Sequence, residues 1–239
     1  MLCLELFSGT GSVGKVCKKL GWEVVSLDLE LEADININIL DWDYKVYPKD
    51  HFDLIWSSPP CVSYSNLQSC WLGRKKADGI IYTKEIMESS MKESDKLVLK
   101  TFEIIEYFNP EFWFLENPAT GKLKSRNIMK DKPFYDVSYC MYSDWGYEKK
   151  TRVWTNKVGF NNKICDKSGS CMNMIDGKHK ARMGCSKTVI DNEKIIRVNT
   201  AELRKKYKNF KNINKTENNE TTLFDRYRIP ENLIFSLFS

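Results

Sequence analysis

The sequence lacks any run of eighteen apolar residues, so we expect no helix that spans a membrane. Its N-terminus also lacks the charged and apolar segments of a secretion signal, and no internal repeat is visible. These absences predict a soluble protein that is not exported. With 239 residues, 42% of them hydrophobic, the chain can bury one sizeable core, or a core with a small extra domain.

Cysteine, in contrast, is plentiful, with eight residues in the chain. Disulfide frameworks belong mainly to exported proteins, so without a secretion signal we expect free thiols in a reducing cytoplasm. A thiol such as Cys61 is then available for chemistry.

The net charge of +5 conceals a strong asymmetry along the chain. Residues 1–119 sum to −7, residues 120–222 to +12, and residues 223–239 to zero. Segregated positive charge favours a polyanionic partner, with nucleic acid the first candidate. An ordinary lysine-rich surface in water explains the same charges equally well.

The opening of the chain predicts a β-turn-α-β unit. Residues 2–7 are typical of a short strand, and a glycine-rich turn follows at 8–12. Residues 13–20 predict a helix, because apolar side chains recur at three- and four-residue spacing. A second strand at 22–27 then ends at the acidic Asp28.

Strand-like and helix-like segments continue to alternate as far as about residue 156. This alternation predicts an α/β fold with a doubly wound, mostly parallel sheet, and it places ligands at the C-terminal ends of the strands. The further segments are strands at 34–40, 52–56 and 112–118, a helix at 83–108, and two strands around a turn at Asp144–Gly146.

The pattern weakens from about residue 157, which divides the chain into a first domain at 1–156 and two further regions. Residues 157–222 predict a small basic region of short polar segments, with one helix capped by Thr200. Residues 223–239 return to apolar periodicity, and we expect them to rejoin the first core.

The glycine turn favours a cofactor with a ribose. Gly9, Gly11 and Gly14 fit the dinucleotide pattern G-x-G-x-x-G, which is weak support by itself. Two features favour S-adenosylmethionine over NAD: the turn is entered through Phe7-Ser8, and Asp28 follows Gly11 by 17 residues, suited to ribose hydroxyls. A turn with a purely structural role remains open.

Three polar residues stand at predicted strand ends or in the basic segment that follows. Cys61 comes directly after two prolines, which would hold a nucleophilic thiol rigidly, although most free cysteines are small buried apolar residues. Glu116 would exchange a proton with a ring nitrogen or serve as a turn acceptor. Arg152 would bind a carbonyl or phosphate oxygen or remain a solvated surface charge.

The motifs F-S-G-T-G, S-P-P-C, E-N-P and T-R-V-W follow one another in this order. Together they resemble the cytosine-C5 DNA methyltransferases, above all the compact members carried by phages and large viruses. The resemblance covers residues 1 to about 156, with a short match at 223–238. It implies a Rossmann-like S-adenosylmethionine-dependent methyltransferase fold with a target-recognition region at 157–222. It further implies a monomer that acts on double-stranded DNA in the cytoplasm of a bacterial or virus-infected cell, with no membrane and no obligate protein partner.

The same resemblance implies a mechanism. Cytosine C5 is a poor nucleophile until a thiolate adds to C6. The resemblance assigns this attack to Cys61, protonation or hydrogen bonding of N3 to Glu116, and contact with the target base or the catalytic loop to Arg152. The base has to leave the duplex stack first, so base flipping is implied as well.

Positions for the cofactor and the DNA are implied too. A loop from Val62 to about Thr83 would close over the flipped base. Cofactor-binding residues are expected at Phe7, Ser8, Gly9, Thr10, Gly11, Asp28, Leu29, Asn38, Ile39 and Pro59, and DNA contacts at Ser63, Ser65, Asn66, Arg74 and Lys150.

The chain departs from the family pattern at several points. Asn38 stands where an aspartate usually reads the adenine of the cofactor, although an amide oxygen can still accept a hydrogen bond. Lys150 replaces an arginine and lacks its planar fork. Val-Ser-Tyr-Ser follows Cys61 in place of Gln-Gly-Phe-Ser, which changes the expected loop contacts but not the chemistry.

A second group of chemically active residues lies in the basic region. Cys165, Cys171, His179 and Cys185 are separated by five, seven and five residues, which matches no zinc-finger pattern. We therefore predict no metal site and expect unconnected thiols in a loop. Zinc binding is the alternative.

Two other functions compete with DNA methylation. The first is an inactive homologue that binds nucleic acid or a partner protein, favoured mildly by Asn38 and Lys150 and opposed by the intact Cys61 and Glu116. The second is an RNA cytosine-C5 methyltransferase, which ranks lower because that branch tends to carry threonine where Ser65 stands.

Overall fold

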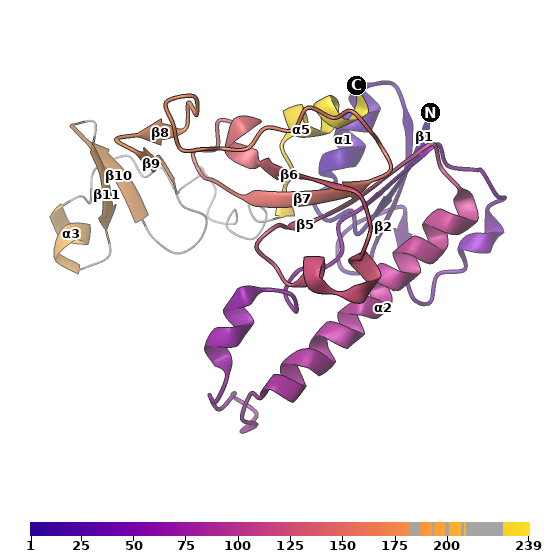
Figure 1. The fold of residues 1–239 in the computed structure, drawn as a ribbon, viewed down its shortest axis with the longest axis horizontal. Helices are drawn as coiled ribbons and strands as arrows, with labels where there is room; N and C mark the ends of the chain where they lie inside the picture. The colour runs from indigo at the N-terminus through magenta and orange to yellow at the C-terminus, as the bar shows by residue number, and fades with distance from the viewer. Residues whose placement is uncertain (182–186, 193, 199–200, 207, 209–226) are drawn as a thin grey trace. The chain divides into compact units, whose positions relative to one another are not determined.

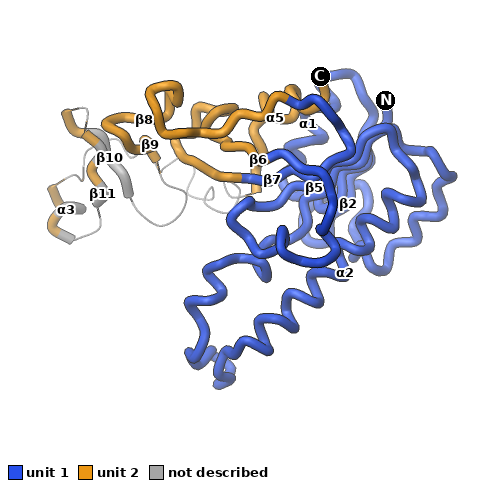
Figure 2. The backbone as a smooth tube through the Cα atoms, viewed as in Figure 1, with its two compact units in different colours: residues 1–135, 151–160 blue, residues 136–150, 161–239 orange. Residues whose placement is uncertain are grey.

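The computed structural model of the chain describes residues 1–181, 187–192, 194–198, 201–206, 208 and 227–239. These residues form two compact units, which Figure 2 distinguishes by colour. The first unit consists of residues 1–135 and 151–160, and the second of residues 136–150 and 161–239. The expected division at 157 and 223, and the return of 223–239 to the first core, remain predictions.

A seven-stranded sheet with the strand order β3-β2-β1-β4-β5-β7-β6 dominates the fold (Figure 1). The pairs β1–β2, β2–β3, β1–β4 and β4–β5 are parallel, whereas β7 runs antiparallel to β5. The prediction of a doubly wound, mostly parallel sheet is therefore confirmed. The strands are β1 (Leu2–Leu6), β2 (Glu23–Asp28), β3 (Ile35–Asn36), β4 (Leu54–Ser57), β5 (Phe112–Pro118), β6 (Phe134–Ser138) and β7 (Lys150–Thr155).

Two helices cover opposite faces of this sheet (Figure 1). On β1, Glu5 accepts hydrogen bonds from the start of α1 (Ser12–Lys19). The alternate residues Leu4 and Leu6 pack in one core cluster with the end of α2 (Lys84–Phe108). The strand order reverses direction at β1, so the C-terminal ends of β1 and β4 mark the switch point where ligands bind in such folds.

Apolar side chains pack densely between α2 and the sheet. The helix follows the predicted range, with Thr83 as its N-cap and Asn109 in the left-handed conformation at its end. Its buried residues include Val98, Thr101 and Phe108, and Leu97 and Phe102 are partly buried. The largest fully buried side chains of the protein include Trp56, Phe52, Phe108, Phe114, Tyr64 and Trp154.

The strand predicted at 34–40 is much shorter in the structure. Only Ile35–Asn36 pairs with β2, because side chains on either side form local hydrogen bonds instead. The Asp34 carboxylate accepts from the backbone N–H and hydroxyl of Ser26, and the Asn38 side chain accepts from the N–H of Leu40. The two strands expected around Asp144–Gly146 are present as β6 and β7, but residues 139–149 form a longer connection than a tight turn.

The described residues of the second unit include two hairpins and two short α-helices. In the first hairpin, β8 (Met174–Ile175) pairs with β9 (Lys178–His179), and Asp176 and Gly177 between them both have positive φ. In the second, β10 (Lys187–Asp191) pairs with β11 (Lys194–Val198). The helices are α3 (Ala201–Lys206) and α5 (Glu231–Phe238), and the expected cap Thr200 lies outside the described residues.

Short 3-10 helices complete the described structure. They are η1 (Tyr44–Val46), η2 (Asn66–Trp71), η3 (Leu123–Ser125), η4 (Asn127–Met129) and η5 (Tyr139–Met141). Within the described part of the chain, none of the helices combines the length and apolar character needed to cross a membrane.

Candidate active site at the C-terminal edge of the sheet

The glycine turn after β1 has the backbone conformation that its sequence predicts. Gly9 and Gly11 have φ values of 52° and 63°, a region that glycine enters without steric cost. Phe7 shares this conformation with a φ of 55°, which is uncommon for an aromatic residue. A Cβ atom at Gly11 would meet no atom within 4 Å, so the turn borders open space.

Glu5, on β1, holds the start of the helix that follows this turn. Its carboxylate is buried and accepts hydrogen bonds from the N–H groups of Val13 (3.1 Å) and Gly14 (2.9 Å), at the start of α1. Burial raises the pKa of Glu5 to about 7, although these hydrogen bonds and the nearby Lys15 and Lys18 act in the opposite direction. Glu5 was not predicted from the sequence. Its position as a lone carboxylate inside an apolar strand could have indicated a buried polar role.

Asp28 connects the end of β2 to the glycine turn. Its Oδ2 atom accepts from the N–H of Gly9 at 2.8 Å, and its Oδ1 atom accepts from the N–H groups of Glu30 and Leu31 at 2.9 Å. A carboxylate has about four acceptor sites, so Asp28 still has one available. The neighbouring Leu29 is exposed.

The third strand brings two further predicted residues toward the same edge. Asn38 is partly buried, and its Oδ1 atom accepts one hydrogen bond, from the N–H of Leu40. Ile39 packs in the core cluster at 2% exposure, so only its backbone is available to a ligand.

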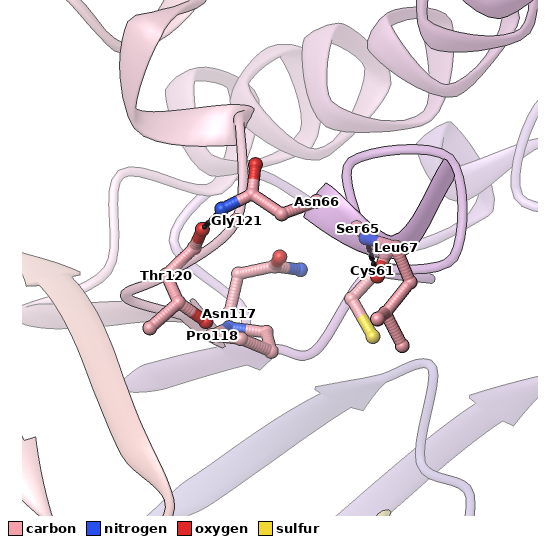
Figure 3. Close-up of a pocket in the computed structure, with 8 residues that line it drawn as sticks. All are labelled: Cys61, Ser65, Asn66, Leu67, Asn117, Pro118, Thr120 and Gly121. Carbon is pink, nitrogen blue, oxygen red and sulfur yellow. Dashed lines mark hydrogen bonds between the residues drawn. The ribbon is translucent and has the colours of Figure 1, made fainter. Parts of the chain in front are cut away.

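Cys61 lines a cavity of about 300 Å³, and the close-up in Figure 3 shows its lining residues. It follows the buried Pro59, and its carbonyl accepts from the N–H of Tyr64 at 3.1 Å, which folds the chain into a turn. The thiol side chain is partly exposed. The cavity is lined by Cys61, Ser65, Asn66, Leu67, Asn117, Pro118, Thr120 and Gly121.

Asn117 is a cavity residue that sequence reasoning did not select. It is 1% exposed, and its Nδ2 atom donates to the Pro59 carbonyl at 2.9 Å, which ties β5 to the segment before Cys61. Its Oδ1 atom has no hydrogen-bond partner among the described residues. Figure 3 shows this side chain extending between the Thr120–Gly121 turn and Cys61. A buried, unsatisfied acceptor beside a cavity is suited to a ligand donor group.

Glu116 and Arg152 lie at the same end of the sheet. Glu116 is buried, immediately before Asn117 on β5, and the pairing with β7 places Arg152 opposite Asn117. The guanidinium carbon of Arg152 lies 3.5 Å from the centre of the Phe134 ring, a cation–π contact that orients the side chain. The structure thus brings Cys61 and Asn117 together in one cavity, with Glu116 and Arg152 beside Asn117 on paired strands.

The chain after Cys61 is anchored to α2. The buried Tyr64 donates its hydroxyl to Asp95 at 2.9 Å, and Asp95 in turn accepts two hydrogen bonds from Arg126 that are shorter than 3 Å. Ser63 accepts hydroxyl bonds from Ser90 and Ser94, which lie one turn apart on α2. The start of the loop is therefore fixed to the helix.

The other residues predicted to contact DNA differ in the contacts that they make within the protein. Ser65 caps η2 at the N–H of Leu67, and Asn66 donates to the carbonyl of Thr120. Arg74 is exposed and stacks over the ring of Trp71, whereas Lys150 lies 3.6 Å from Glu148.

The residues considered for zinc lie elsewhere. Cys165, Cys171 and His179 come together in the second unit, and Cys185 lies outside the described residues.

Comparison with known proteins gives one close relationship in sequence. A protein of Frog virus 3 (isolate Goorha), named "Probable DNA (cytosine-5)-methyltransferase", is 42% identical over 176 residues, which cover 73% of this chain and 79% of the viral protein. No family model matches the chain.

Solved structures give more distant matches. The Dnmt2 methyltransferase of S. pombe matches with 13% identity and a TM-score of 0.44, over 73% of this chain and 55% of the solved one. A mutant of Spodoptera frugiperda DNMT2 matches with 18% identity and a TM-score of 0.41, over 69% and 53%. The chain thus spans about half the length of these solved chains.

Proposed function

Because this chain belongs to the DNA (cytosine-5)-methyltransferase family, we propose that it transfers a methyl group from S-adenosylmethionine to C5 of cytosine in double-stranded DNA. The observation that carries this proposal is the position of Cys61. A partly exposed thiol lies at the switch point of a doubly wound sheet, in one cavity with a buried amide that has an unused acceptor. The cavity volume of about 300 Å³ is at the lower end of the range for small-ligand sites, as a single base requires.

The chain's own residues supply the covalent chemistry. The Cys61 thiolate adds to C6 of the cytosine and forms an S–C6 bond, while Glu116 gives a proton or hydrogen bond to N3. Electron density then moves to C5, which becomes nucleophilic. Once C5 carries the transferred methyl group, the C5 proton is lost to solvent, the C5–C6 double bond forms again, and the S–C6 bond breaks to return the thiolate. The unused Oδ1 acceptor of Asn117 is suited to the exocyclic amino group of the same base.

S-adenosylmethionine supplies an electrophilic methyl group when it is bound. The residues that would hold it fit such a molecule: the open glycine turn at Gly9 and Gly11 allows close approach, and Asp28 has an acceptor site for a ribose hydroxyl. Asn38 has acceptor capacity for an adenine amino group. Glu5 holds the turn to α1, so it positions this surface without touching the ligand.

The loop after Cys61 presents groups that suit a duplex with an extruded base. Leu67 and Trp71 are 72% and 50% exposed, and Arg74 stacks beside Trp71. Exposed apolar side chains next to cationic ones are typical of surfaces that enter a base stack and contact phosphates. We assign this loop, from Val62 to about Thr83, to closure over the DNA.

The deciding experiment combines the purified protein, S-adenosylmethionine labelled on its methyl group, and unmethylated duplex DNA or RNA. We expect labelled 5-methyldeoxycytidine from the wild type and none from Cys61→Ala. A matched control, Cys17→Ala, removes a buried thiol from α1 and should retain labelling.

A second readout tests the covalent step. With duplex DNA that carries 5-fluorocytosine, the C5 proton is replaced by fluorine and the S–C6 bond persists, so mass spectrometry should find the base attached to Cys61. Labelling of RNA alone would overturn the DNA assignment. Absence of both labelling and cofactor binding would favour the inactive homologue.

A further inference from the structure

Three cysteines and one histidine of the second unit converge on one point. Cys140, Cys165, Cys171 and His179 each offer one ligand atom, and all four atoms lie within 4.8 Å of one another. The residues come from separate segments: η5, the connection after residue 161, and strand β9. None of them takes part in the methyl transfer proposed above.

Two of the distances are within about 0.2 Å of those in a tetrahedral zinc site. The His179 Nε2 atom lies 3.6 Å from the Cys165 sulfur and 3.7 Å from the Cys171 sulfur. With Zn–S bonds of about 2.3 Å and Zn–N bonds of about 2.0 Å, tetrahedral geometry separates sulfur and nitrogen by about 3.5 Å. The cluster therefore needs little movement to enclose a metal ion.

A buried amide holds the segments of the cluster together. Asn173 is 3% exposed, and its Nδ2 atom donates to the carbonyls of Cys140 and Ser143, both at 2.7 Å. Its Oδ1 atom accepts from the N–H of Gly146 at 3.0 Å. This amide fixes the backbone around Cys140 to the turn that carries Cys171. Such support around the ligands is typical of metal sites.

The apolar cluster around the ligands is small in the described part of the chain. The three cysteines form a small buried cluster, and among the residues that the structure describes Met141 and Met174 pack against it as partly buried apolar residues. Small regions without a sizeable apolar core usually depend on a disulfide or a metal ion. The three cysteines are free thiols in the structure.

We propose that Cys140, Cys165, Cys171 and His179 bind one Zn²⁺ ion in a closed, structural Cys₃His site. Four protein ligands fill the tetrahedron, so the site offers no open position for catalysis. Zinc replaces the thiol protons of the three cysteines, which are released to solvent. The site shares three residues with the set considered from sequence, and Cys140 takes the fourth position.

Metal analysis of the full chain tests this proposal directly. Protein purified without chelators, under reducing conditions and with zinc in the growth medium, should contain one zinc ion per chain. Cys165→Ser should lose it, whereas Cys70→Ser, which alters an exposed thiol of the first unit, should keep it. Cobalt added to the metal-free protein should give the visible bands and the thiolate charge-transfer band of a tetrahedral site.

Replacing one metal ligand by another tests the site without relying on a variant that could fail to fold. His179→Cys supplies a fourth thiolate, so this variant should retain zinc and show stronger thiolate charge transfer with cobalt. His179→Ala should bind the metal at least about tenfold more weakly. Wild-type protein that contains no zinc and binds neither metal would overturn the proposal, as would zinc content unaffected by changes at all four residues. Because the readout is metal content, failure here leaves the methyltransferase proposal standing.

Discussion

The two units contain interiors of different composition. In the first, aliphatic and aromatic side chains from five strands and α2 form two clusters, one around Leu4, Ile55 and Phe108 and one around Leu115 and Trp154. In the second, the cluster at Cys140 consists of three thiols flanked by two methionines. Apolar packing therefore surrounds the sheet of the first unit, whereas the cluster at Cys140 contains few apolar side chains.

This difference explains where each unit places its reactive groups. In the first unit, polar side chains such as Cys61 and Asn117 lie at the edge of a core that is stable without them, so they are available for chemistry. In the second unit, thiols and an imidazole lie in the interior itself, where a metal ion would use all of them. Reactive residues at an edge indicate catalysis, and reactive residues inside a small core indicate a structural site.

Removal of zinc should have the largest effect on stability, and it should destabilise the second unit but not the first. Structural zinc contributes on the order of 10 kcal/mol to the folding of small metal-binding modules. With a strong chelator, we expect peptides from residues 140–181 to lose protection in hydrogen-exchange mass spectrometry, while peptides from β1 and β4 keep theirs. An equal loss of protection in both units would contradict a stabilising role confined to the second.

The next largest effect is expected at Glu116. Loss of a general acid lowers rates by roughly 10²–10⁴, so Glu116→Gln should slow single-turnover methyl transfer by that factor and leave zinc content unchanged. A matched control is Glu111→Gln, which changes an exposed glutamate just before the other end of β5. If both variants retain the wild-type rate, Glu116 has no role in proton transfer.

The sequence predicted those parts of the molecule whose causes are local. The glycine turn, α1, α2 and the turn at Cys61 each depend on neighbouring residues, and each is found in the structure close to its predicted position. The doubly wound, mostly parallel sheet follows from the alternation of strands and helices.

Features that depend on distant contacts were missed. Asn117 acquires its importance from a hydrogen bond to Pro59, 58 residues earlier. Cys140 joins the thiol cluster although it precedes Cys165 by 25 residues, so spacing alone pointed to Cys185 instead. The strand at 34–40 was overestimated because side-chain bonds of Asp34 and Asn38 compete with the strand ladder.

The buried Glu5 predicts a pH dependence that belongs to the first unit alone. Because its pKa is raised to about 7 in the folded protein from 4.5, its stabilising contribution is complete below about pH 4.5 and is lost as pH rises through 7. The full loss corresponds to about 3 kcal/mol. We expect the difference in unfolding free energy between wild type and Glu5→Gln, measured with urea, to shrink by this amount between pH 4.5 and 7.5. A difference independent of pH would show that Glu5 is ionised throughout.

The smallest effect is expected from alanine substitutions at two glycines, Gly14 in the first unit and Gly169 in the second. Gly14 has close neighbours, and Gly169 has none within 4 Å of an added Cβ atom. A Cβ at Gly14 would lie 2.7 Å from the Glu5 Oε2 atom and 3.3 Å from Val24 Cγ1, so Gly14→Ala displaces the buried Glu5 carboxylate, the start of α1, or both. We expect a loss of about 1–3 kcal/mol in unfolding free energy, as for other overpacked interiors, together with weaker S-adenosylmethionine binding in calorimetry. A Cβ at Gly169 would meet no atom within 4 Å, so Gly169→Ala should change stability by less than about 0.5 kcal/mol. Equal stability of the two variants would mean that the contact between Glu5 and the start of α1 can shift without cost, and that Glu5 does not fix the glycine turn.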